Sequence, residues 1–78
     1  MRTLRDQVDD IIKEHHSWGG IENNSPKQLR EYLESIGYEV IVVGGDMRLI
    51  EWECTHAKLP RCFVDIWVDD FTIILGVH

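Results

Sequence analysis

The spacing of apolar residues changes its period at Tyr38, and this change limits the chain to a mixed α and β fold. Before Tyr38, apolar residues recur every three or four positions, which is the spacing of one face of an α-helix. After Tyr38, apolar and polar residues largely alternate, which is typical of strands with one covered face. Because 78 residues suffice for one core only, we expect residues 1–78 to form a single α+β domain.

Two helices are predicted in the first half of the chain. The first covers residues 4–15, with Thr3 as its N-cap. The second begins at a capping box of Ser25 and Gln28, has a proline at its first position, and ends at Gly37. The apolar stripes of the two helices are Leu4, Val8, Ile11, Ile12 and His15, and Leu29, Tyr32, Leu33 and Ile36.

Four strands are predicted in the second half, over residues 38–43, 47–54, 62–68 and 71–77. The segments that connect them are short enough for hairpins, so we expect an antiparallel meander. Both helices then pack on one face of this four-stranded sheet, in the order ααββββ.

The register of the strands follows from matching apolar residues across the sheet. A turn at residues 69–70 predicts four apolar pairs on the covered face: Val68 with Phe71, Ile66 with Ile73, Val64 with Leu75, and Cys62 with Val77. A turn at residues 44–46 predicts two more pairs: Val40 with Ile50, and Tyr38 with Trp52. We also expect Cys54 to lie opposite Cys62 on that face.

The opposite, helix-free face is the predicted binding surface. The same register places Ile41, Leu49 and Trp67 in one row and Glu39, Glu51 and Asp65 in the next. Like charges on neighbouring strands destabilise a sheet, so either nearby cations such as Lys58 and Arg61 or a partner must offset them. The candidate partner-binding residues are Glu39, Leu49, Glu51, Glu53, Phe63, Asp65 and Trp67.

The charge of the chain narrows the class of partner. Fourteen acidic and eight basic residues give a net charge of −6, which excludes the basic footprint of a nucleic-acid-binding protein. A secondary candidate surface is the stripe of Asp6, Asp10 and Glu14, one helical turn apart, which is near the spacing of successive phosphates. The ordinary alternative is a solvated helix face that nearby basic residues neutralise.

No set of residues indicates a reaction. Cys54, His56 and Cys62 with another histidine offer zinc-ligand chemistry, but their spacing matches no zinc motif. The two thiols are predicted to pack in the core as small apolar groups. We therefore expect no enzymatic activity, no metal and no cofactor, with a metal-binding or hydrolytic site on these residues as a distant alternative.

Trp18 lies between the predicted helices, where residues 17–20 are expected to end the first helix. One interpretation makes its side chain a plug at one end of the core, and this is the one we expect. The other makes it an exposed anchor for a partner, because tryptophan is common among interface hot spots.

Together these features predict a small acidic binding protein, an inhibitor or an adaptor, that docks on a basic protein and contacts neither nucleic acid nor membrane. It is similar in general type to the small acidic inhibitors of phages and mobile elements that imitate nucleic acid. The alternative is a structural homodimer formed through Ile41, Leu49 and Trp67. Without an export signal, we expect a cytoplasmic location and reduced thiols.

Overall fold

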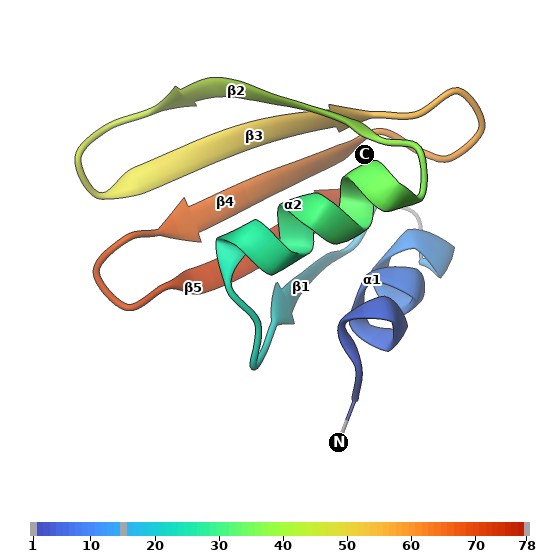
Figure 1. Ribbon diagram of the computed structural model, residues 1–78, viewed down its shortest axis with the longest axis horizontal. Coiled ribbons are helices and arrows are strands. Elements are labelled where there is room, and N and C mark those ends of the chain that lie inside the picture. The colour runs from blue at the N-terminus through green and yellow to red at the C-terminus, as the bar shows by residue number, and fades with distance from the viewer. Residues whose placement is uncertain (1, 15, 78) are drawn as a thin grey trace.

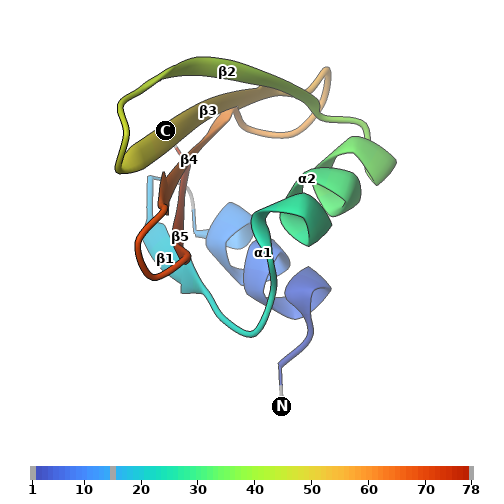
Figure 2. The same cartoon turned by 60° about the vertical axis from the view of Figure 1, so that its left-hand side comes forward.

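The computed structural model describes residues 2–14 and 16–77, and its helices and strands confirm an α+β fold. The elements are α1 (Leu4–Lys13), β1 (Trp18–Ile21), α2 (Pro26–Ser35), β2 (Glu39–Gly45), β3 (Leu49–Thr55), β4 (Cys62–Trp67) and β5 (Thr72–Val77). The strands form one antiparallel sheet in the order β1-β5-β4-β3-β2. The sheet curves around the two helices, which lie on the same side of it (Figures 1 and 2).

The sheet has a fifth strand, so the expected ααββββ arrangement is wrong. Residues 18–21 do more than separate the two helices. They form β1, in which Trp18 lies opposite Gly76 and Ile21 lies opposite Ile73. Two of its four residues are glycines, which have low strand propensity, so β1 is held by its pairing with β5 rather than by local preference. Only β2–β5 form the predicted meander.

The ends of both helices follow the predicted capping chemistry. The Thr3 hydroxyl accepts a hydrogen bond from the backbone N–H of Asp6 at 3.2 Å. Ser25 and Gln28 form the reciprocal capping box, with bonds of 3.3 and 2.8 Å. At the other end of α2, Gly37 has a φ of 104°, which is the left-handed geometry predicted there. The first helix ends at Lys13, and His15 lies outside the described residues.

The predicted register is confirmed for the central strands. Cys62, Val64 and Ile66 of β4 lie opposite Val77, Leu75 and Ile73 of β5. Val68 and Phe71 lie in the turn that joins these strands rather than within them. Cys54 lies opposite Cys62, as expected.

The predicted register of β2 against β3 is wrong. Val40 lies opposite Cys54, not Ile50. The turn forms later than expected because the Asp46 carboxylate accepts hydrogen bonds from the backbone N–H groups of Arg48 and Leu49, at 2.7 and 3.1 Å. The two glycines expected in the turn therefore extend β2, which carries a bulge between Val42 and Gly44. From Glu39 to Val42 the register shifts by four residues, an even number, so these side chains keep their predicted faces.

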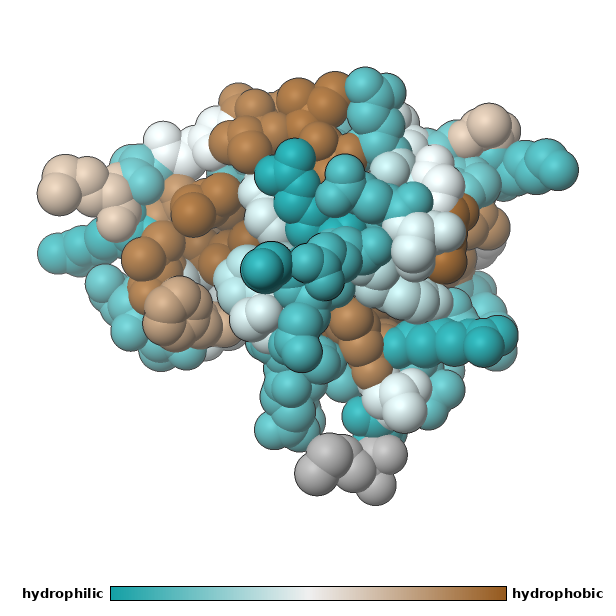
Figure 3. All heavy atoms as spheres, viewed as in Figure 1, coloured by the Kyte–Doolittle hydropathy of each residue, from teal (hydrophilic) through white to brown (hydrophobic). Residues whose placement is uncertain are grey.

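The core lies between the helices and the covered face of the sheet. Its fully buried side chains include Val8 of α1 and Leu29 and Leu33 of α2. On the helix side, the outer surface of α2 is mostly hydrophilic, whereas apolar atoms come to the surface over β2, beyond the helices (Figure 3). Neither helix within the described residues is long and apolar enough to span a membrane.

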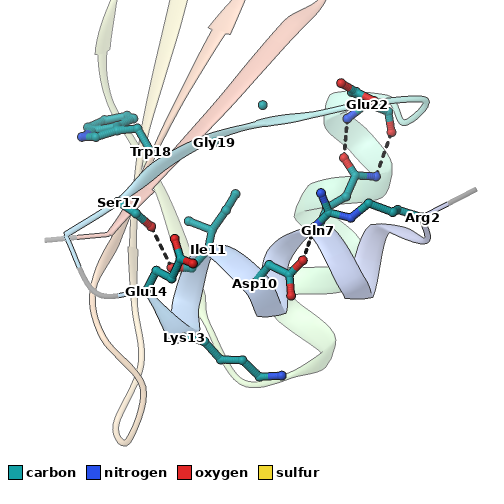
Figure 4. A pocket seen from close by; sticks show the side chains of 11 residues that line it. Arg2, Gln7, Asp10, Ile11, Lys13, Glu14, Ser17, Trp18, Gly19 and Glu22 are labelled. Carbon is teal, nitrogen blue, oxygen red and sulfur yellow. Dashed lines mark hydrogen bonds and ion pairs between the residues drawn. The ribbon is translucent and has the colours of Figure 1, made fainter.

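A buried glutamine joins α1 to the residue that follows β1. The spacing of apolar residues in the sequence did not predict that a polar side chain would be buried there. Gln7 is 4% exposed. Its side-chain amide donates to the carbonyl of Glu22 at 3.1 Å and accepts from the N–H of Glu22 at 2.6 Å (Figure 4). The side chain thus pairs with a backbone unit as a neighbouring strand would, which satisfies polar groups that burial would otherwise leave unpaired.

Replacing Gln7 with leucine should lower the free energy of unfolding by about 1–3 kcal/mol, because both backbone groups of Glu22 lose their partner. Urea denaturation measures the loss. Lys13→Leu is the matched control, since Lys13 is exposed on the same helix. Equal stability of the two variants would contradict a structural role for the Gln7 amide.

Candidate partner-binding face

The side of the sheet away from the helices, which we call the open face, gathers the side chains with the clearest binding chemistry. Residues on it alternate along each strand with residues of the core. The larger side chains of this face include Trp18, Glu39, Ile41, Val43, Leu49, Glu51, Glu53, Phe63, Asp65, Trp67 and Ile74. Trp18 and Trp67 are 47% and 45% exposed.

Two carboxylates face each other at the centre of the open face. Glu51 of β3 lies directly opposite Asp65 of β4. The expected row of three carboxylates is wrong, because the shifted register of β2 places Glu39 opposite Thr55 and Gly44 opposite Glu51. The arrangement is therefore a pair of like charges on adjacent strands, which destabilises the sheet by an amount within about 0.2–1 kcal/mol.

The neighbouring acid on this face has a cation of its own. The guanidinium of Arg61 lies 3.3 Å from a carboxylate oxygen of Glu53 and 5.2 Å from the ring centre of Phe63. Across the described residues, the ion pairs use Asp9, Asp10, Glu34 and Glu53, and none includes Glu51 or Asp65. The protein thus neutralises the charge of Glu53 on the open face, whereas no described cation pairs with Glu51 or Asp65.

Trp18 lies on the open face, so its expected role as a plug of the core is wrong. Its strand position directs the side chain away from the helices and onto Gly76 of β5. A Cβ atom at position 76 would overlap the indole ring. The missing side chain of Gly76 is therefore what allows the ring to lie against the sheet.

The central carboxylates and the rings of Trp18 and Phe63 surround a shallow hollow of about 620 Å³. Aromatic faces and carboxylates together attract cations, since the ring face and the carboxylate both carry negative potential. The hollow has the chemistry of a site for a guanidinium or ammonium group. Its lining residues are Trp18, Val43, Glu51, Trp52, Arg61, Phe63 and Asp65.

The secondary candidate surface on α1 is neutralised at Asp10 only, because Asp6 and Glu14 take part in no ion pair of the described residues. Asp10 pairs with Arg2, and Arg5 lies 3.5 Å from the carboxylate of Asp9. A hollow of about 630 Å³ between α1 and β1 is lined by side chains of both charges, including Arg2 and Lys13 beside Asp10 and Glu14 (Figure 4). This mixture does not favour a basic partner over an acidic one.

The two cysteines are buried in the core, away from solvent. Cys54 and Cys62 are fully buried. The Cys62 thiol donates to the Tyr38 hydroxyl at 3.3 Å, and that hydroxyl donates to the carbonyl of Pro60 at 2.8 Å. Burial raises the pKa of Cys54 from 9.0 to about 12 and also raises the pKa of Cys62. Thiols in this state are poor nucleophiles and poor metal ligands.

His56, the third residue of that cluster, holds the backbone of the β3–β4 loop. Its Nε2 lies 2.8 Å from the carbonyl of Ile36, and its Nδ1 accepts from the N–H groups of Lys58 and Leu59. Both ring nitrogens are thus engaged by backbone. No group of three or more metal-ligating side chains lies together in residues 2–14 and 16–77, and His15 and His78 fall outside this part.

Comparison with known proteins does not place the chain in a family. No family model matches it, and neither curated proteins nor solved structures give a significant match.

Gly76→Ala should displace the Trp18 indole and lower the free energy of unfolding by about 1–3 kcal/mol, because the new methyl group overlaps the ring. The indole N–H resonance of Trp18 in NMR spectra reports the displacement. Gly20→Ala is the matched control on the same face, since a Cβ there meets nothing within 4 Å. An unmoved Trp18 resonance in Gly76→Ala would refute this packing.

The stability of the protein should fall as the pH rises from about 9 towards 12. Over this range the unfolded chain loses the thiol proton of Cys54, whereas the folded chain keeps it because its pKa is raised to about 12. The unfolded state then binds fewer protons, so the free energy of unfolding decreases with pH. Urea denaturation of the parent and Cys54→Ala measures the effect, and an equal decline in both would exclude Cys54 as a source.

Proposed function

We propose that this protein is a small binding protein, an inhibitor or an adaptor, whose open face docks on a basic surface of another protein. The observation that carries the proposal is the Glu51–Asp65 pair, which forms no ion pair with any described residue and lies beside the exposed ring of Trp18. A partner that supplies a cation there removes a repulsion that the isolated fold retains.

The chain itself contains an example of the proposed contact. Arg61 reaches over the ring of Phe63 and bonds the carboxylate of Glu53. An arginine of the partner that enters the hollow finds the same combination of ring and carboxylate at Trp18, Glu51 and Asp65. Arginine suits this site better than lysine, because its planar group stacks on a ring while it bonds to an acid.

The overall charge supports the same class of partner. A net charge of −6 attracts basic proteins over a distance set by the ionic strength and repels nucleic acid. Trp67, opposite Leu49 and two residues beyond Asp65 in β4, adds exposed aromatic area to the open face outside the hollow. Such a ring contributes binding energy where the partner excludes water.

Reversing the charge of the central pair tests the proposal. Glu51→Lys with Asp65→Lys should leave the fold intact and weaken binding of a synthetic arginine-rich peptide at least about tenfold. Binding of the double variant should also depend less on salt. Titration calorimetry at two salt concentrations gives both results.

A control variant carries the same change of charge elsewhere. Glu31→Lys with Asp69→Lys replaces two exposed acids outside the hollow. Peptide binding that falls equally in the two double variants would show attraction to net charge alone and would refute a site on the open face. A peptide of equal length in which lysine replaces arginine should bind more weakly to the parent.

A further inference from the structure

The edge strand β2 lacks most of the features by which proteins prevent strand pairing. Edge strands are usually short, or carry a bulge, lysine, proline or a charge in their middle. The bulge of β2 lies after Val42, towards the end of the strand. The other edge of this sheet, β1, has only four residues. In contrast, β2 has seven residues, and its run from Val40 to Val43 is uncharged and β-branched throughout.

Both sides of this strand are apolar and exposed. Ile41 projects on the open face and is 46% exposed. Val43, in the bulge, lines the hollow of that face and is 52% exposed, and Val42 projects on the helix side and is 58% exposed. The apolar surface over β2 is visible along the upper margin of Figure 3. Only another strand covers both sides at once while it also bonds the backbone groups of the free edge.

We propose that β2 pairs with the β2 strand of a second copy of this chain, antiparallel and centred on Ile41. In this register Ile41 faces its own copy and Val40 faces Val42, so β-branched side chains meet across the dyad. Glu39, the one charge on the strand, faces Val43 rather than another Glu39.

The charges of the edge favour this occupant over a strand from a basic protein. Glu53, which lies across from Ile41 within the sheet, is already paired with Arg61. A basic strand would therefore find only Glu39 to pair with, whereas an uncharged β-branched strand matches the run residue by residue. The chain supplies such a strand itself.

The dimer has a defined shape. Because paired residues in this register project to the same side, the open faces of both copies join into one surface of ten strands. Each central carboxylate pair then lies on the same side of the dimer, related by the dyad. This proposal differs from a dimer formed face to face, in which the open faces would be covered.

Sedimentation velocity from micromolar to millimolar concentration tests the pairing. We expect a reversible dimer whose dissociation constant rises at least about tenfold in Ile41→Lys. In that variant the lysines oppose each other across the dyad, while each one faces Glu53 within its own sheet, so the fold is kept. Ala57→Lys, an exposed loop position, adds the same charge and should dimerise like the parent.

Two results of the sedimentation experiment would overturn the proposal, and hydrogen exchange tests it if the variant does not fold. A parent protein that stays monomeric throughout refutes it, and so does a dimer that Trp67→Ser dissociates and Ile41→Lys does not. If Ile41→Lys fails to fold, hydrogen exchange of the parent decides: protection of residues 39–43 that grows with concentration supports pairing, and its absence overturns it.

Discussion

The fold depends on the burial of one continuous apolar surface on β3, β4 and β5. Val64, Leu75 and Val77 on this surface are fully buried, and burial of each such side chain stabilises the fold by about 1.5–3 kcal/mol. The helices have ten residues each and are too short to persist alone in water, so this surface is also what holds them in place. Because it takes up one side of every central strand, the polar and aromatic side chains that remain are forced onto the other side.

The parts of the fold that local chemistry controls were predictable from the sequence. Strands β4 and β5 carry an apolar residue at every second position, so one register aligns Cys62, Val64 and Ile66 with Val77, Leu75 and Ile73. The capping box at Ser25 acts within one turn of helix. The parts that depend on distant pairing were not. Strand β1 exists because β5 is beside it, and the turn after β2 is moved by a single carboxylate at Asp46.

The residues of the candidate site also differ in whether the sequence could place them. The opposition of Glu51 and Asp65 was predictable, because it follows from the pairing of β3 with β4. Glu39 was misplaced with the register of β2, and Trp18 was assigned to the core because nothing near it in the sequence reveals Gly76 as its neighbour. Gly76, a residue without a side chain in the last strand, indicates a close neighbour only once β1 is known to pair with β5.

The pairing of β1 with β5 also constrains when the protein can fold during synthesis. Strand β1 leaves the ribosome before α2 and the whole β2–β4 meander, and its partner comes after all of them. Until then the residues of β1 have no strand to pair with, and α1 lacks β5, one of the two strands against which it packs. The first half of the chain therefore cannot complete its fold before the second half is made. Closure over so long a loop slows folding, and the exposed valines of β2 are already present while it proceeds. The nascent chain is therefore most exposed to aggregation and proteolysis just before its last strand joins the sheet.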